Sequence, residues 1–301
     1  MRFSKYHGTG NDFVLVEDMD DRWRLDQDLI EAVCDRRRGV GADGLIRIVR
    51  SPEADFFMDY YNADGAVAEM CGNGIRCLAK YVYERGFIDR TEFDVTTRAG
   101  LKRVVVGAED GVAARVTVGM GLPAFARKDI PMKGPADGRF IEQPLEVDGR
   151  VFTATALSMG NPHCVLVVDS AEALAALPVP SLGSEVEHRP EFPNRTNVEF
   201  VQVTDGVLRA RVWERGSGET MACGTGACAA VVASSLAGLS GPEADIEFPG
   251  GVLHVDWRQD EDVYLTGPAV WVYDGELSAE WLSHATAAEW RPRAGATERA
   301  P

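Results

Sequence analysis

The chain has 301 residues and a formal net charge of −16 at pH 7. That charge repels polyanions, so nucleic acid and anionic membrane surfaces are unfavourable partners. No run approaches the roughly 18 uninterrupted apolar residues of a membrane span. The opening residues Met1–Lys5 lead into a strand-like run and show no apolar leader segment. We therefore expect a soluble, cytoplasmic protein without a nucleic-acid or membrane partner.

Strands dominate the predicted secondary structure. Short β-branched runs punctuated by glycine predict them at Phe13–Glu17, Leu45–Val49, Val104–Val106, Val112–Val118, Val165–Val168, Val198–Val203, Leu208–Val212, Val252–Trp257 and Val263–Tyr273. Helical periodicity occurs in four segments, Leu25–Arg37, Gly74–Arg85, Ala171–Leu177 and Gly226–Leu239. This mixture predicts the α+β class.

Two of these helices directly follow copies of one short pattern, Cys71-Gly72-Asn73-Gly74 and Cys223-Gly224-Thr225-Gly226. We predict two pseudo-symmetric lobes, each a bent mixed or antiparallel sheet wrapped around a central helix, with the active site in the cleft between them. Proline and glycine in residues 119–134 place the boundary there.

The predicted division of the chain follows from that boundary. Residues 1–118 form an N-terminal lobe that a strand near 262–277 completes, and residues 119–261 form the second lobe. Residues 285–301, rich in alanine, arginine and proline, are expected to be a flexible tail.

The six cysteines and five histidines do not predict a metal site. There is no Cys-x-x-Cys, the spacing from Cys71 to Cys77 is too wide for a zinc knuckle, and the histidines are scattered. Without an export signal, the cysteines are expected to be reduced thiols.

The two cysteines of the repeated pattern are candidates for proton transfer. Two thiols on opposite sides of one carbon can remove a proton from one face and return one to the other, which inverts a stereocentre. A helix N-terminus has unpaired N–H groups and partial positive charge, which favour a thiolate and a bound carboxylate. We therefore expect lowered pKa values for Cys71 and Cys223. The backbone N–H groups that would hold the carboxylate belong to Gly72, Asn73, Gly224 and Thr225.

The other four cysteines have a simpler interpretation. A buried core thiol is the commoner role of a free cysteine. We assign that role to Cys34, Cys77, Cys164 and Cys228, which lie in apolar runs outside the glycine pattern.

Further polar residues gather in loops rich in glycine and proline: Asn11, Asn62, Asn161 with His163, Asn197, and Glu214-Arg215. A single asparagine in such a loop is typical of turns, and a lone histidine before an apolar strand is typical of a core. Their number favours a polar pocket for a small zwitterion.

Several of these stretches closely resemble diaminopimelate epimerase, in family order and over most of the chain. They are Lys5–Phe13, Asn62–Gly65, Cys71–Cys77, Gly160–His163, Glu214–Thr220 and Cys223–Cys228. The resemblance implies a cofactor-independent isomerase that interconverts LL- and meso-diaminopimelate, a precursor of lysine and peptidoglycan. It also implies a possible homodimer.

The resemblance assigns roles by position. Cys71 and Cys223 match the two acid/base thiols, and His163 and Glu214 match groups that tune them, Glu214 also belonging to the substrate-binding set. Residues matching the cradle of the reacting carboxylate are Gly72, Asn73, Gly224 and Thr225, with Asn11 and Asn161 nearby. Residues matching the distal end of the substrate are Asn62, Asn197 and Arg215, whose guanidinium can form a bidentate pair with a carboxylate.

One position departs from part of the family. Some relatives carry glutamine after the Gly-Ala-Asp sequence at 41–43, where this chain and other members have Gly44. A side-chain contact to the substrate is therefore absent there.

Alternative functions remain open on the sequence. A proline or hydroxyproline racemase resembles the family in its paired cysteines but lacks the distal polar set, and phenazine-type isomerases do not keep both thiols. A thiol–disulfide redox protein has no use for Arg215. A non-catalytic protein that binds an amino acid would still bind it after loss of both thiols. Pyridoxal phosphate is disfavoured because no lysine has a recognisable Schiff-base setting.

Overall fold

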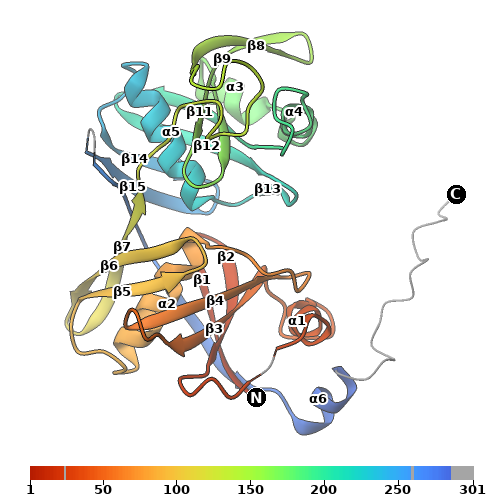
Figure 1. The fold of residues 1–301 in the computed structure, drawn as a ribbon, viewed down its shortest axis with the longest axis vertical. Coiled ribbons are helices and arrows are strands. Elements are labelled where there is room, and N and C mark those ends of the chain that lie inside the picture. Colours follow the sequence, from red (N-terminus) through yellow and green to blue (C-terminus); the bar gives the residue numbers. More distant parts are fainter. Residues whose placement is uncertain (24, 259–260, 286–301) are drawn as a thin grey trace, which may run out of the picture.

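The computed structural model describes residues 1–23, 25–258 and 261–285. They form two lobes, one below the other in Figure 1. The lower lobe contains β1 (Arg2–Gly8), β2 (Asn11–Glu17), α1 (Gln27–Cys34), β3 (Gly44–Arg50), β4 (Phe56–Asn62), α2 (Gly72–Glu84), β5 (Glu92–Thr97), β6 (Gly100–Glu109), β7 (Val112–Gly121), β17 (Val270–Glu276) and α6 (Ala279–Ala285). The predicted α+β class with two lobes is confirmed.

The upper lobe has a matching set of elements. It contains β8 (Phe140–Val147), β9 (Arg150–Ser158), β10 (Pro162–Val167), α3 (Ala171–Ala176), α4 (Val179–Glu187), β11 (Asn197–Thr204), β12 (Val207–Glu214), β13 (Gly218–Thr220), α5 (Gly224–Leu236), β14 (Glu243–Phe248), β15 (Gly251–Trp257) and β16 (Val263–Gly267). In each lobe one long helix, α2 or α5, packs inside the curved sheet (Figure 1).

The two sheets repeat one topology. In the lower lobe β2 pairs parallel with β3, and β4 pairs parallel with β5. In the upper lobe β10 pairs parallel with β11, and β12 pairs parallel with β14. All other strand pairs are antiparallel. In the lower lobe the long helix α2 follows β2, β3 and β4, and in the upper lobe α5 follows β10, β11 and β12, with only the short β13 between. The lobes are therefore pseudo-symmetric, although their sequences share little beyond the cysteine pattern.

Strand β16 connects the lobes, because it pairs antiparallel with both β15 and β7. The chain then returns to the lower lobe, where β17 pairs antiparallel with β1. The continuous strand predicted at Val263–Tyr273 is therefore two strands, separated at Pro268 and Ala269. Proline has no N–H for a sheet ladder, so the chain can leave one sheet here and join the other.

Both central helices begin and end in the same way. Each has 13 residues, with a cysteine at the N-cap position. Each ends on a glycine with positive φ, Gly86 or Gly238. The N–H groups of Gly86 and Phe87 bond the carbonyls of Tyr83 and Val82, and the same pattern closes α5 at Gly238. These are Schellman motifs, which fix where each helix stops.

Burial explains why these two helices are central. In α2 the apolar side chains of Ile75, Leu78 and Val82 are fully buried. In α5 almost every residue from Gly224 to Ser234 is buried, and most are alanine, valine or glycine. A helix that is apolar on all sides needs a partner on all sides, which the curved sheet provides.

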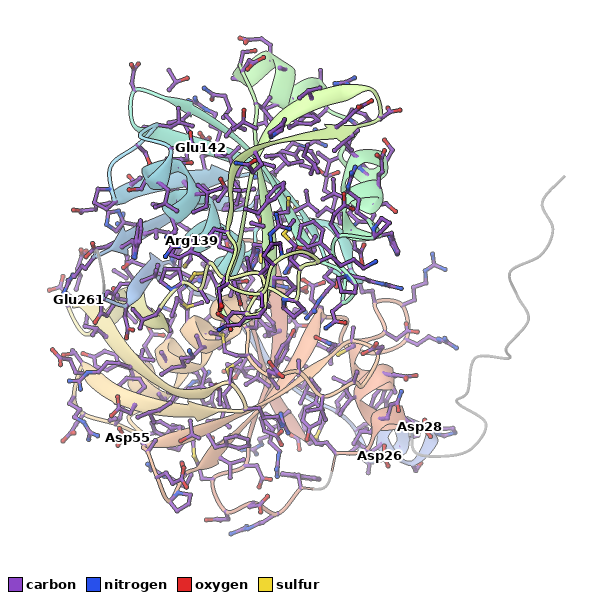
Figure 2. All side chains as sticks on the ribbon, turned by 45° about the horizontal axis from the view of Figure 1, so that its top comes forward. Asp26, Asp28, Asp55, Arg139, Glu142 and Glu261 are labelled. Carbon is purple, nitrogen blue, oxygen red and sulfur yellow. The ribbon has the colours of Figure 1, made fainter. Side chains whose placement is uncertain are left out.

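Acidic side chains lie on the outer surface. Asp26, Asp28 and Glu261 are exposed and lie on the periphery of the molecule (Figure 2). Within the described residues, no helix is long and apolar enough to cross a membrane.

The predicted tail overlaps the last helix. Ala285, its first residue, is the buried end of α6, which packs against α1. Residues 286–301 lie outside the described residues.

Candidate active site

The N-termini of α2 and α5 meet head to head. A methyl group added to Gly224 would lie 3.3 Å from the Cα atom of Gly72, and one added to Gly72 would lie 3.5 Å from the Cα atom of Gly224. Only residues without a side chain allow the backbones to approach this closely. Cys71 and Cys223 precede these glycines, both with extended backbone at the N-cap position. The two matched thiols therefore stand at the contact between the lobes.

A cavity of 540 Å³ opens at this contact and is lined by both cysteines. Cys71 is half-buried, and Cys223 is buried. The predicted site residues that line the same cavity are Asn11, Asn62, Gly72, Asn73, Asn161, Glu214, Arg215, Gly224 and Thr225. The cavity thus takes residues from both lobes and from four of the predicted polar loops.

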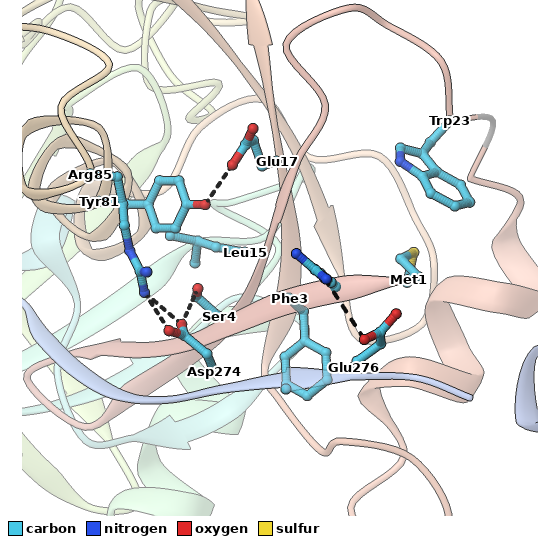
Figure 3. Close-up of a pocket in the computed structure, with 12 residues that line it drawn as sticks. Met1, Phe3, Ser4, Leu15, Glu17, Trp23, Tyr81, Arg85, Asp274 and Glu276 are labelled. Carbon is cyan, nitrogen blue, oxygen red and sulfur yellow. Dashed lines mark hydrogen bonds and ion pairs between the residues drawn. The ribbon is translucent and has the colours of Figure 1, made fainter. Parts of the chain in front are cut away.

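A larger cavity of 720 Å³ lies elsewhere in the lower lobe and contains none of the predicted site residues. Its charged groups are already paired: Arg85 binds Asp274, and the Tyr81 hydroxyl donates to Glu17 (Figure 3). The cavity between the helix ends is therefore the better candidate for chemistry.

Two hydrogen-bonded asparagines connect Cys71 to the upper lobe. Asn11 Oδ1 lies 3.6 Å from Cys71 Sγ and accepts a hydrogen bond of 3.2 Å from Asn73 Nδ2. Asn73 Nδ2 also donates to the carbonyl of Ala222, next to Cys223, at 3.2 Å. The Asn11 amide is oriented by Asp43, which accepts from Asn11 Nδ2 at 2.7 Å.

His163 does not line the cavity, and its side chain is fully buried. Its two ring nitrogens bond Glu199 Oε1 at 2.8 Å and Asn161 Oδ1 at 3.0 Å. Asn161 Nδ2 in turn donates to Thr225 Oγ1, which lies 3.5 Å from Cys223 Sγ. A chain of hydrogen bonds through Asn161 and Thr225 therefore connects His163 to Cys223.

Asn197 also lies behind the cavity wall. It is buried, donates to the carbonyl of Pro162 at 2.8 Å, and accepts from the backbone N–H of Arg215 at 2.9 Å. The Arg215 side chain is exposed, with Nη1 3.3 Å from the carbonyl of Asn194. Asn197 therefore holds the turn that carries Arg215.

Sequence reasoning missed three charged residues of this region. Lys102 on β6 and Glu69 line the cavity, and Glu199 on β11 binds His163 behind it. Glu199 has a sequence signal, since a lone acid in the apolar run Val198–Val201 requires a partner when the strand is buried. Lys102 belongs to no motif and has no such signal.

Known proteins of one family match most of this chain. The family model described as diaminopimelate epimerase matches residues 3–126 and 155–272. A diaminopimelate epimerase of Moorella thermoacetica is 49% identical over 92% of this chain and 99% of its own length. One of Pelotomaculum thermopropionicum is 48% identical over 92% of this chain and 98% of its own. The chain belongs to the diaminopimelate epimerase family.

Solved structures extend the likeness of fold beyond the family. A phenazine biosynthesis protein of the PhzF family from Bacillus anthracis covers 92% of the chain and 99% of its own, with a TM-score of 0.66 and 18% identity. A probable proline racemase from Agrobacterium radiobacter K84 covers 92% and 93%, with a TM-score of 0.65 and 16% identity. At these identities the two structures show a shared fold.

Burial dominates the ionisation of the two thiols in this member of the diaminopimelate epimerase family. It raises the pKa of Cys71 to about 11, although N–H groups of Gly74 and Asn73 at the start of α2 act in the opposite direction. Burial also raises the pKa of Cys223 well above its usual value, and the carboxylates of Glu214 and Glu199 add to the effect. The expectation that the helix ends would lower both pKa values is wrong, because desolvation of a thiolate outweighs a few N–H groups.

Glu214 lines the same cavity as the second thiol. Its carboxylate accepts a hydrogen bond from Thr220 Oγ1. Burial raises the pKa of Glu214. The negative charge of Glu214 disfavours the Cys223 thiolate and so helps to keep the proton on the sulfur.

Gly44 has no room for the glutamine that some family members carry. A methyl group there would lie 2.5 Å from the carbonyl oxygen of Tyr61 and 2.7 Å from the Tyr60 ring. Tyr60 is buried and fills this space. A side chain at position 44 would require the β3–β4 pair to move.

Proposed function

We propose that the protein interconverts LL- and meso-diaminopimelate by a two-thiol proton transfer without a cofactor. The observation that carries the proposal is the head-to-head contact of two helix N-termini, each preceded by a cysteine that lines one shared cavity. A substrate α-carbon held between the two sulfurs would face one base on each side. Family membership supplies the substrate class.

The reaction requires one thiolate and one thiol. The thiolate removes the α-proton, the electron pair of the C–H bond moves into the adjacent carboxylate, and the opposite thiol delivers its proton to the other face. The negative charge on the carboxylate would be stabilised by N–H groups of Gly72, Asn73, Gly224 and Thr225. The positive α-ammonium group of the substrate favours the thiolate in the buried cavity, because it offsets the desolvation that raises both thiol pKa values.

We assign the outer polar residues to the distal end of the substrate. Asn62 and Arg215 line the cavity, and Asn197 holds the Arg215 turn. Asn161, His163 and Glu199 form the hydrogen-bonded support of Thr225 and Cys223. His163 and Asn197 thus act as positioning residues.

Deuterium labelling tests the two-base mechanism. In D₂O, LL-diaminopimelate should give meso product carrying deuterium at the inverted carbon from the first turnover, because the donor thiol has exchanged with solvent. Mass spectrometry of product and recovered substrate at low conversion measures this. Product without label would indicate return of the same proton by a single base and would refute the proposal. L-Proline is the matched control, and turnover of proline alone would favour a proline racemase.

Recognition of the distal end is tested on Arg215. Arg215→Met should raise KM for diaminopimelate, lowering kcat/KM by about 10-fold to 100-fold, as loss of a charge-assisted hydrogen bond of ~1.5–3 kcal/mol predicts. The matched control is Arg209→Met, on the strand β12 that the Arg215 turn follows; Arg209 pairs with Glu247 and does not line the cavity. Equal effects of the two substitutions would contradict this role.

We also propose that the protein is a cytoplasmic homodimer. All six cysteines are free thiols, as a reducing compartment favours. Strand β17 has exposed apolar side chains at Val270, Trp271, Val272 and Tyr273, each between 42% and 51% exposed. β17 pairs with β1 on one edge within the described residues, and an exposed apolar edge strand is a typical pairing surface.

Light scattering tests the dimer. The measured mass should be twice the 32.7 kDa of one chain. Val272→Lys should shift it toward one chain, whereas Val151→Lys, at an exposed position of the upper lobe, should leave it unchanged. A wild-type mass of one chain at micromolar concentration would refute the dimer.

A further inference from the structure

Arg76 on α2 is a buried cation that the proposed proton transfer does not use. Its side chain is fully buried. The guanidinium donates to Asn73 Oδ1 at 2.8 Å, to the carbonyl of Gly72 at 3.0 Å and to the carbonyl of Pro268 at 3.3 Å. Thr9 Oγ1 lies 3.5 Å away. These acceptors are neutral, so the hydrogen bonds leave the positive charge uncompensated.

A buried charge is expensive unless an opposite charge compensates it. In the part of the chain that the structure describes, the titratable groups that act on Arg76 are the thiols of Cys77, Cys71 and Cys228. Of these three, only Cys71 lines the cavity between the helix ends. The anion that the site can generate beside Arg76 is therefore the Cys71 thiolate.

Two glycines fix the place of this charge. A methyl group on Gly267 would lie 3.0 Å from Arg76 Nε, and one on Gly8 would lie 3.1 Å from Nη2. Both contacts are tighter than ordinary packing allows. Strands β1 and β16 therefore leave a slot that fits the flat guanidinium.

Asn73 and Asn11 connect Arg76 to the sulfur of Cys71. Arg76 Nη2 donates to Asn73 Oδ1 at 2.8 Å. Asn73 Nδ2 donates in turn to Asn11 Oδ1, which lies 3.6 Å from Cys71 Sγ. Arg76 therefore fixes the amide that holds Asn11 against Cys71, in addition to its direct charge.

The second helix lacks this cation. Counted from the cysteine, the position of Arg76 in α2 corresponds to Cys228 in α5. Cys223 instead faces two carboxylates, Glu214 and Glu199. Cys71 faces Glu214 and Tyr60 besides Arg76. The pseudo-symmetric thiols therefore have unequal electrostatic surroundings.

We propose that Arg76 makes Cys71 the thiol that ionises first and leaves Cys223 as the proton donor of the resting enzyme. This assignment rests on the two-thiol function proposed above. Arg76 touches no reacting atom in this arrangement, so it is a positioning residue that acts through its charge and through the side chains of Asn73 and Asn11.

Alkylation kinetics on the full chain test the proposal. Neutral iodoacetamide reacts with thiolates, and peptide mass spectrometry separates modification of Cys71 from that of Cys223 between pH 6 and pH 10. Cys71 of the wild-type protein should react faster. Arg76→Met should slow Cys71 about 10-fold at pH 8, the effect of about one pKa unit, and leave Cys223 within about twofold. Arg76→Lys, which keeps the charge, should slow Cys71 less, and Arg37→Met, at an exposed arginine of the same lobe, should change neither rate.

Three results would overturn the proposal: an unchanged Cys71 rate in Arg76→Met, equal slowing of both cysteines, or equal effects of Arg76→Met and Arg76→Lys. If Arg76→Met does not fold, Gly267→Ala takes its place, because the added methyl would lie 2.5 Å from Leu253 Cδ2 and 3.0 Å from Arg76 Nε and so crowds the guanidinium; it should slow Cys71 more than Cys223. Turnover of diaminopimelate by the wild-type protein is measured separately. Faster Cys71 labelling without turnover would refute the proposed function, whereas turnover without faster labelling would refute the role of Arg76.

Discussion

Replacing either Cys71 or Cys223 with serine is expected to lower kcat for diaminopimelate epimerisation by at least about 10²- to 10⁴-fold, the usual contribution of a general acid or base. A hydroxyl group ionises far less readily than a thiol. Serine can therefore neither remove the α-proton as a base nor readily deliver a proton as an acid. Because serine is nearly isosteric, the helix ends should keep their contact. Steady-state kinetics in both directions measures the effect, with circular dichroism to verify the fold.

Cys34→Ser is the matched control for these two variants. Cys34 is a buried, free cysteine of α1, and burial raises its pKa to about 12, yet it does not line the cavity. Its substitution should change stability and leave kcat within about twofold. If Cys71→Ser or Cys223→Ser retained a tenth or more of wild-type kcat, the two-thiol mechanism would be untenable.

The parts of the fold that the sequence predicts are those that depend on local chemistry. The Cys-Gly-x-Gly patterns place both helix starts within two residues, because capping positions and glycine act within one turn. The relation between the lobes is different. The contact of Gly72 with Gly224 depends on how β16 joins two sheets, and no local pattern encodes the pairing of β16 with β7.

The same limit applies to the site. The polar loops identified five residues that line the cavity, and the two Cys-Gly-x-Gly patterns identified six more. They could not separate residues that face the cavity from residues that support it, such as His163 and Asn197. Burial decides that difference, and it also reverses the expected direction of the pKa shifts at Cys71 and Cys223. Arg76 illustrates the point. An arginine is usually exposed, so the sequence alone suggests a surface position, but in the fold Arg76 is fully buried.

Gly224→Ala is expected to lower kcat by up to about 10-fold, because the facing backbone must give by a few tenths of an ångström, and a displacement near 1 Å at a reacting centre costs about 10²-fold. The added methyl would lie 3.3 Å from Gly72 Cα and 3.0 Å from Leu265 Cδ2. The leucine side chain can rotate away, but the Gly72 backbone can yield only if the two helix ends separate. The two sulfurs would then move apart, and one α-carbon could no longer be within reach of both.

Stability should respond much less than activity to this substitution. Alanine is favoured over glycine in a helix by up to about 1 kcal/mol, which offsets part of the steric strain, and Gly224 has no positive φ that alanine would resist. Gly107→Ala is the matched control, because its nearest neighbour, the carbonyl oxygen of Arg115, lies at 3.6 Å. Kinetics and thermal unfolding of both variants separate the two effects. A Gly224→Ala enzyme with kcat within twofold of wild type would show that the reaction tolerates separated helix ends, and the close contact would then have a structural role alone.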